Sequence, residues 1–314
     1  MMKYILKKIA ALIITLLVIS LLTFLTFLII PGDSATTSLG THGTKEAMDA
    51  LREEQGLDKP VLVRYRWWIT GILKGDLGKS LQYNMPVSTL LKDRFVVTFY
   101  LAILSLIILI VLSLPLGIFT VKNQGGFLDK MITFLCQINM AIPPFFLGMI
   151  MILIFGLILR VFTPGGYVQA QDDFWGFIGY LFFPALSIAL PKAGMLIKLL
   201  RTSLLRELKL DYVRTARSKG DTKNQILFRH VLKNSFIPVL TFLGMMIAEI
   251  FAGSIMIEQV FNLPGLGRLL VTAISNRDFP VVSAIIMYIA ALIVFINFII
   301  DILYQYIDPR VRIS

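Results

Sequence analysis

The chain has 314 residues, of which 57% are hydrophobic and 16% are charged, and its mean hydropathy is +0.80. Soluble domains average about 25% charged residues, so this composition indicates a protein that crosses a membrane several times. The net charge of +11 is explained by basic cytoplasmic loops that face anionic lipid headgroups. It does not indicate nucleic-acid binding, because no polar region is large enough to form a binding domain. The single cysteine, Cys136, excludes an internal disulfide and a thiolate metal cluster.

The N-terminal segment predicts a first membrane span. Residues 1–8 are basic and form the expected cytoplasmic N-terminus, and residues 9–30 carry no charge. A signal peptide begins in the same way, but its apolar core is only about 7–15 residues long. The longer run, which ends at Pro31-Gly32, favours an uncleaved transmembrane helix over 9–30.

Residues 31–94 form the longest polar region and are predicted to be an extracytoplasmic loop with short helices. One helix is expected over 44–55, with Thr44 as its cap. A second is expected over 61–73, where arginine, tyrosine and tryptophan side chains are clustered. This second segment suits either an amphipathic helix at the membrane interface or a helix packed within the loop.

Five further apolar runs predict membrane spans, so the fold class is all-α and polytopic with six transmembrane helices. The third of the six spans contains Pro143-Pro144, where we expect the helix to bend or split because proline lacks a backbone N–H group. The fourth is expected to be interrupted at Pro184 and Pro191. The five further spans are 95–121, 131–162, 174–200, 236–261 and 281–304.

The distribution of basic residues predicts the orientation of the chain. Six spans place both termini on one side of the membrane. Of the 30 Lys and Arg residues, 17 fall in the N-terminus, the 122–130 turn, the 198–233 run and the tail, which would share that side. The short loop 163–173 on the other side has none. Because cytoplasmic loops carry an excess of positive charge, both termini are predicted to be cytoplasmic, including the tail 305–314.

The sequence contains no constellation that predicts catalysis. The segment 75–80 ends like a phosphate-binding loop, but Leu73 stands where the motif needs glycine, so we interpret the segment as a turn. His42 and His230 lack metal-ligand spacing. No nucleophile elbow, metalloprotease helix or close pair of carboxylates within a span is present. The chain is therefore predicted not to be an enzyme, and no metal site is expected.

Ionisable residues within the predicted spans are few. Glu249 lies midway through the fifth span, where a charge costs about 2.5–3.5 kcal/mol, so it should face a neighbouring helix or a wet cavity. Two interpretations stay open: Glu249 lines a pathway or interface, or it forms a structural hydrogen bond with another helix. Arg160, Lys192 and Lys198 lie near span ends, and we expect their charged groups to reach the membrane surface.

A long basic run separates the fourth and fifth spans. It predicts a short helix over 212–219, with Asp211 as its cap and Gly220 as its left-handed end. The next helix would begin at Asp221 or Thr222 and continue into the fifth span. Such a helix–turn–helix could fit a groove on a soluble partner and transmit a push to both spans. Composition alone favours the alternative, a loop that binds lipid headgroups through its charges.

The predicted helix over 212–219 has one face of small and aromatic side chains and a cationic rim around the rest of its surface. The face comprises Tyr212, Thr215 and Ala216, with Val213 beside it, and the rim comprises Arg214, Arg217 and Lys219.

The basic run resembles the EAA cytoplasmic loop of ABC-importer permeases, in the form carried by the B-type subunit of dipeptide and oligopeptide systems within the peptide/nickel subfamily. The resemblance covers essentially the whole chain, because further motifs of that subfamily follow in order. In the basic run the matching residues are Arg214-Thr215-Ala216-x-x-x-Gly220, Arg229-His230-Val231-Leu232-Lys233-Asn234 and Ile237-Pro238. Elsewhere they are Gly75-Asp76-Leu77-Gly78-x-Ser80, Gly253-Ser254-x-x-x-Glu258-x-Val260-Phe261-x-x-Pro264-Gly265-Leu266-Gly267, Arg277-Asp278-x-Pro280 and Asp301-x-x-Tyr304 with Asp308-Pro309-Arg310-Val311-Arg312.

The chain departs from the wider permease pattern at three positions of this loop. Arg214 stands in place of a glutamate, His230 in place of an isoleucine and Lys233 in place of a proline. Peptide-type members resemble this chain at the same positions, which supports the placement in that subfamily.

The resemblance implies a type I ABC-importer permease in the cytoplasmic (inner) membrane, with 95–304 as a single transmembrane domain and 201–235 as the coupling loop. Two homologous permeases would pair around a central path within membrane lipid, and an extracytoplasmic binding protein would deliver substrate. Two cytosolic ATPase subunits would bind ATP and Mg, so this chain would hold no cofactor of its own. Glu249 and Glu258 are candidates for the pathway or an interface. The implied ATPase-coupling residues are Asp211, Tyr212, Arg214, Thr215, Ala216, Arg217, Lys219 and Gly220.

Several functions remain open from the sequence. Di- or oligopeptides are the expected substrates, with nickel or a metal chelate as the alternative, although no His- or Met-rich pathway favours a metal. An ion-coupled secondary carrier and a membrane anchor that recruits a cytosolic partner are alternatives from other classes. Ion-coupled carriers usually show several membrane-embedded charges and inverted repeats, which this sequence does not clearly show.

Overall fold

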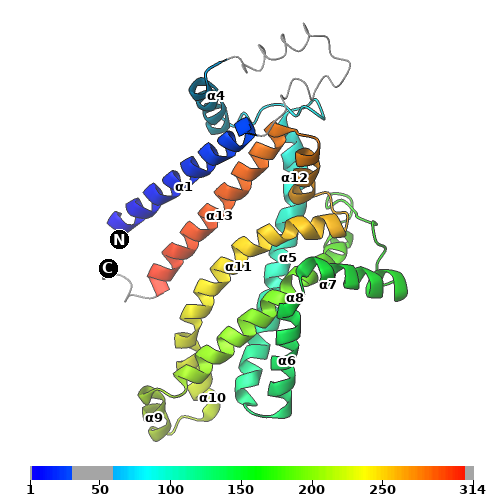
Figure 1. Cartoon of the computed structure of the whole chain (residues 1–314). Coiled ribbons are helices and arrows are strands. Elements are labelled where there is room, and N and C mark those ends of the chain that lie inside the picture. The colour runs from blue at the N-terminus through cyan, green and yellow to red at the C-terminus, as the bar shows by residue number, and fades with distance from the viewer. Residues whose placement is uncertain (1, 30–58, 308–314) are drawn as a thin grey trace. The chain divides into compact units, whose positions relative to one another are not determined.

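Helices form nearly all of the regular structure. The computed structural model describes residues 2–29 and 59–307 (Figure 1). Within these residues, five helices are long and apolar enough to cross a membrane, and there are six spans if one bent helix pair counts as a single span. The predicted all-α, polytopic class is therefore confirmed. The helix expected over 44–55 lies outside the described residues.

The chain divides into two compact units. The first unit combines the N-terminal part of the chain, up to Thr98, with the segment Pro264–Phe295. Its helices are α1 (Met2–Ile29), α4 (Val61–Leu73), the first turns of α5 (Val87–Lys122), α12 (Leu266–Ser275) and the first part of α13 (Phe279–Ile307).

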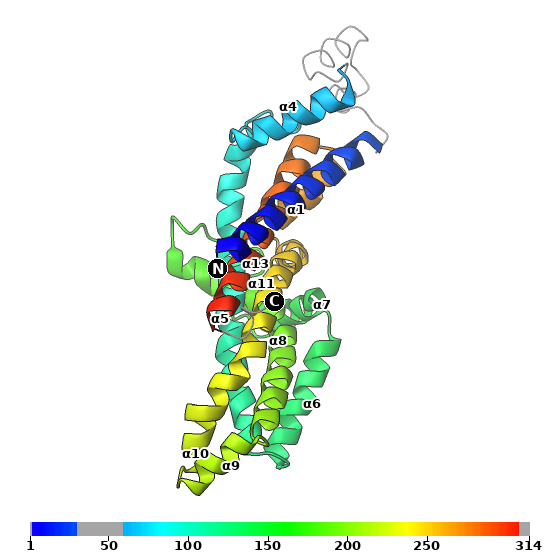
Figure 2. The same ribbon diagram turned by 90° about the vertical axis from the view of Figure 1, so that its left-hand side faces the viewer.

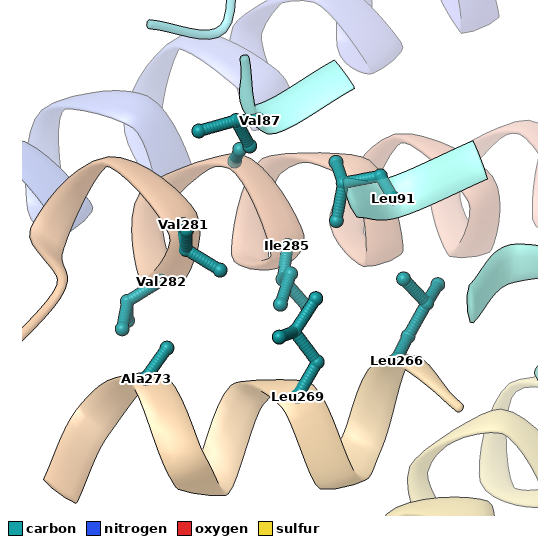
Figure 3. Packing of buried hydrophobic residues seen from close by; sticks show 9 residues of the cluster. Val87, Leu91, Leu266, Leu269, Ala273, Val281, Val282 and Ile285 are labelled. Carbon is teal, nitrogen blue, oxygen red and sulfur yellow. The ribbon is translucent and has the colours of Figure 1, made fainter. Parts of the chain in front are cut away.

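The core of the first unit lies between α12, α13 and the start of α5. Apolar residues recur every three or four positions along α12, so they gather on one face of that helix. In Figure 3 this face points toward α13 and the first turn of α5. The backbone N–H of Leu266 donates to the Thr98 hydroxyl at 2.9 Å, which fixes the start of α12. The core residues are Val87, Leu91, Leu266, Leu269, Ala273, Val281, Val282, Ala284 and Ile285.

Helix α4 packs against α1 through aromatic side chains. The Tyr65 and Ser20 hydroxyls are 2.8 Å apart. The Phe24 ring lies 5.3 Å from the Tyr65 ring and 5.9 Å from the Trp68 ring, measured between centroids. Trp67 points outward and is 55% exposed. Helix α4 therefore contacts α1 along one side, while none of its residues is buried and Trp67 stays on its outer side. This arrangement is compatible with both interpretations of 61–73.

The second unit contains the remaining helices. They are the rest of α5, α6 (Phe127–Ala141), α7 (Pro144–Met151), the π-helical η2 (Ile152–Ile158), α8 (Phe174–Glu207), α9 (Asp211–Ser218), α10 (Lys223–Gln225), the π-helical η3 (Ile226–Val231), α11 (Leu232–Val260) and the end of α13. The helical path is unbroken from α10 through η3 to the end of α11.

The predicted break at Pro143-Pro144 is confirmed. The segments Phe127–Ala141 and Pro144–Ile158 meet at an angle of 103°, and the turn between α6 and α7 is visible in Figure 2. Ile142 has the extended backbone that proline imposes on the residue before it, with φ −88° and ψ 123°. The α-helix cannot continue through this pair, so its axis changes direction.

Helix α8 is the central helix of the second unit, and the expected interruptions in it are wrong. It runs unbroken through Pro184 and Pro191 to Glu207. Each proline removes one backbone hydrogen bond, but α6, α7 and α11 pack along α8 and bury it, which stabilises the helical path. A Cβ atom at Gly194 would lie 2.9 Å from the carbonyl oxygen of Cys136, so α8 and α6 approach closely at this glycine.

Candidate docking site between α8 and α11

The segment between α8 and α11 folds into the predicted helix–turn–helix, with a different start. Leu210, in extended conformation, is the cap residue of α9, and Asp211 is its first helical residue. The predicted cap at Asp211 is therefore wrong, and no side chain caps this helix end. The Asp211 carboxylate instead lies 3.3 Å from the Arg214 guanidinium. Both side chains are exposed, so this pair contributes little to stability.

Gly220 ends α9 as predicted. It has φ +94°, in the left-handed region. Its N–H donates to the Arg217 carbonyl at 3.1 Å, and the Asp221 N–H donates to the Ala216 carbonyl at 3.2 Å. These two bonds are the pair of a Schellman motif. A Cβ at Gly220 would meet no atom within 4 Å, so backbone conformation alone favours glycine here.

Thr222, rather than Asp221, begins the next helix. Its hydroxyl accepts from the Gln225 N–H at 3.3 Å, and its own N–H donates to the Gln225 side chain at 2.8 Å, which forms a capping box. The Asp221 carboxylate lies 3.0 Å from Nε2 of His230. The turn after α9 is thereby joined to η3, at the base of α11.

The exposed surface of α9 is its cationic rim. Val213 and Ala216 are buried, and Tyr212 is half-buried, so these side chains hold α9 against the unit. The Tyr212 hydroxyl donates to the Glu207 carboxylate at 2.7 Å. Burial raises the pKa of Tyr212, so this hydroxyl keeps its proton. Thr215 points outward with the rim, so the predicted face of Tyr212, Thr215 and Ala216 is not a single exposed patch.

Val213, which the sequence places beside that face, is 2% exposed and is the most buried residue of α9. The residues that α9 leaves exposed are Asp211, Arg214, Thr215, Arg217, Ser218 and Lys219, together with Gly220.

The turn between α5 and α6 lies at the same end of the second unit as α9 (Figures 1 and 2). The ammonium of Lys122 sits 4.7 Å from the Phe228 ring centroid in η3. Arg201 of α8 donates two hydrogen bonds, at 2.9 and 2.8 Å, to the buried carboxylate of Asp129 at the start of α6. Such bidentate pairs are strong and directional. These contacts join α8 to α6, and the end of α5 to η3.

The two carboxylates singled out in the fifth span lie in different environments. Glu249 accepts from the Lys192 ammonium at 2.8 Å, which joins α11 to α8. The prediction that Lys192 reaches the membrane surface is wrong: it lies midway along α8 with its side chain 11% exposed, because Glu249 neutralises it there. Glu249 itself is 50% exposed. Glu258 is fully buried, with 0% exposure.

Two of the subfamily motifs meet in the first unit, a contact that the sequence does not reveal. The Asp278 carboxylate accepts from the Ser80 hydroxyl and from the N–H groups of Leu81 and Gln82, both at 3.2 Å. Gly75 and Gly78 have φ of +82° and +81°, which confirms that this segment is a turn.

Two known protein families match this chain over most of its length. Residues 113–313 match the family described as "binding-protein-dependent transport system inner membrane component", and residues 1–102 match the N-terminal family of the same component. The chain belongs to the permeases of binding-protein-dependent ABC importers.

Relatives match this permease over nearly its whole length. The oligopeptide transport system permease protein AppB of Bacillus subtilis is 36% identical over 315 residues, covering 99% of this chain and 100% of the relative. The glutathione transport system permease protein GsiC of Salmonella typhimurium is 34% identical, covering 99% of each chain. This permease is a multi-pass membrane subunit of a transport complex. It is not an enzyme, because ATP hydrolysis is carried out by separate ATPase subunits.

Proposed function

We propose that this permease moves di- or oligopeptides across the cytoplasmic membrane, as one half of the path in an ATP-driven importer. The full-length likeness to permeases named for oligopeptide and glutathione transport supports this substrate class. A homologous permease forms the other half of the path, and an extracytoplasmic binding protein delivers the peptide. Two ATPase subunits hold ATP and Mg, and this chain needs no cofactor of its own.

The exposed rim of α9 is the part that docks on one of the ATPases. Arg214, Arg217 and Lys219 point away from the unit, whereas Val213 and Ala216 anchor the helix. The Tyr212–Glu207 hydrogen bond holds α9 to the end of α8, and the Asp221–His230 contact joins the turn after α9 to η3, at the base of α11. Movement of an ATPase against α9 would therefore shift two spans together, which is the coupling that alternating access requires.

Reconstitution of the complex tests the proposal. Proteoliposomes that contain both permeases and both ATPases, supplied with binding protein and a labelled tripeptide, should accumulate the peptide only with ATP. Omission of the binding protein or of the ATPases should abolish uptake. Uptake by this permease alone under a proton or sodium gradient would contradict the proposal. If the complex imports a nickel chelate but neither glutathione nor any other peptide, the chain is still an importer permease, but the peptide substrate is rejected.

A further inference from the structure

One side of α11 is exposed along the membrane span and differs from a lipid-facing surface. Its exposed residues recur every three or four positions, so they form a stripe along the helix. Between Ile9 and Ile29, by contrast, helix α1 carries no charged residue, and most of its exposed side chains are Ile, Leu and Val. The stripe carries two hydroxyl or amide side chains, two methionines, an alanine and a carboxylate. We name it the α11 stripe, and it comprises Thr241, Met245, Glu249, Ala252, Met256 and Gln259.

The charge in the α11 stripe is held in place by a buried partner. Lys192 Nζ lies 2.8 Å from Glu249 Oε2, and the Lys192 side chain is 11% exposed. The Glu249 side chain is 50% exposed. The ammonium therefore holds the carboxylate from within the unit, and the carboxylate remains the accessible part of the pair.

A carboxylate is unfavourable against hydrocarbon, and charged residues within spans usually face a bundle interior or a water-filled cavity. Half of the Glu249 side chain is open, and Gln259 and Thr241 on the same stripe are also polar. The flanking methionines have flexible, polarisable side chains that suit contact with many different apolar groups. These properties together favour a wet surface that touches varied ligands.

We infer that the α11 stripe lines the substrate path and that Glu249 is the carboxylate that contacts the amino groups of peptides in transit. Lys192 is a positioning residue that orients Glu249 and offsets part of its charge. The contact is therefore weak enough for the peptide to leave, as transport requires. This inference rests on the proposed function, because a free peptide carries the N-terminal ammonium that Glu249 would bind.

Cysteine labelling tests the placement of the α11 stripe. The native Cys136 is buried, and a Cys136→Ala background removes it as a target. In the full complex with binding protein and ATPases, Met245→Cys and Met256→Cys should react with a charged, water-soluble methanethiosulfonate reagent. Trapping the complex with loaded binding protein and peptide should slow that reaction. Leu17→Cys on the apolar, exposed face of α1 is the matched control and should stay unreactive.

Two labelling outcomes would overturn the inference. If the stripe cysteines react no faster than Leu17→Cys, the stripe faces lipid. If they resist the reagent but form disulfide crosslinks to cysteines of the second permease, the stripe is a subunit interface. Neither outcome depends on the identity of the substrate. The labelling can therefore reject the placement of the α11 stripe while peptide uptake still supports the proposed function, and peptide uptake can be absent while the labelling still supports the placement.

Substitution of Glu249 tests the ligand. The experiment uses a tripeptide and its N-acetyl derivative, after uptake of each by the wild-type complex has been measured. Glu249→Gln also removes the partner of Lys192, so uptake of both peptides can fall, but uptake of the free tripeptide should fall roughly two- to fivefold further than uptake of the N-acetyl peptide, the range of an exposed charge pair. Glu249→Asp should recover most of the difference, and ATPase stimulation by loaded binding protein should persist. Equal losses for both peptides, or no loss for either, would reject the role of Glu249.

Discussion

Gly220 shows how a single residue can determine the shape of the docking surface. Its φ of +94° allows the chain to turn from α9 into the capping box at Thr222. No neighbouring atom would meet a side chain at this position, so the cost of a substitution comes only from the backbone. Residues other than glycine lose about 1–2 kcal/mol in the left-handed region, and asparagine loses least.

Gly220→Val should therefore uncouple transport from ATP hydrolysis. The Schellman bonds from residues 220 and 221 would be lost or strained, and the exposed rim of α9 would tilt. We expect peptide uptake by the reconstituted complex to fall sharply while the complex still assembles. Gly220→Asn is the matched control and should retain most uptake. Full uptake in the Gly220→Val complex would show that this turn does not transmit movement.

Asp278 should be a major determinant of stability in the first unit. Its carboxylate accepts hydrogen bonds from the Ser80 hydroxyl and from the backbone N–H groups of Leu81 and Gln82. Asp278→Ala would leave these groups without their charged partner and should cost roughly 2–3 kcal/mol. A lower midpoint of thermal unfolding of the purified complex would report this loss. Asp172→Ala, at an exposed position, is the control and should leave the midpoint unchanged.

At the scale of elements, ion pairs fasten the helices of the second unit beneath α9. Arg201 and Asp129 join α8 to α6, and Lys192 and Glu249 join α8 to α11. α8 therefore takes part in both pairs and, through Glu207 and Tyr212, also holds α9. A displacement of α9 therefore acts on α8 through Glu207, and on η3 through the Asp221–His230 contact.

The Arg201–Asp129 pair offers a measurable test of that connection. Breaking a buried pair by removing one partner typically costs about 3–5 kcal/mol, because the other charge stays buried. Asp129 is buried and Arg201 is partly exposed, so Arg201→Ala should lie near the lower end of this range. The exchange Arg201→Asp with Asp129→Arg should recover part of the loss. If the midpoint of thermal unfolding of the double variant is no higher than that of Arg201→Asp alone, the pair does not stabilise the packing of α6 against α8.

At the scale of the whole molecule, much of the fold was predictable because a membrane span requires an apolar run of about 20 residues, which is visible in the sequence. The bend at Pro143-Pro144 was predictable from local chemistry, and so was the left-handed Gly220. The unbroken path of α8 through Pro184 and Pro191 was not, because tertiary packing rather than propensity stabilises it. The Lys192–Glu249 pair joins positions 57 residues apart, and a single sequence carries no signal of such a contact.

The predicted orientation, with both termini in the cytoplasm, has a direct test. In a Cys136→Ala background, Lys219→Cys on the α9 surface and Asp172→Cys in the loop before α8 are both exposed. An impermeant maleimide added to intact cells should label Asp172→Cys only, and permeabilised cells should show label at both. Labelling of Lys219→Cys in intact cells would reverse the orientation and remove α9 from reach of any ATPase.

The π-helical η3 lies between α9 and the α11 stripe and helps to set the rotation of one about the helix axis relative to the other. A π-helix closes its hydrogen bonds five residues apart instead of four, and one residue corresponds to about 100° of turn in an α-helix. The six residues Ile226–Val231 lie between the capping box and α11, so they help to set the phase of every side chain above them. Deleting one residue there would swing the α11 stripe by about 100° relative to α9. The direction in which Glu249 points is therefore set partly by η3, which lies some twenty residues earlier in the same continuous helix.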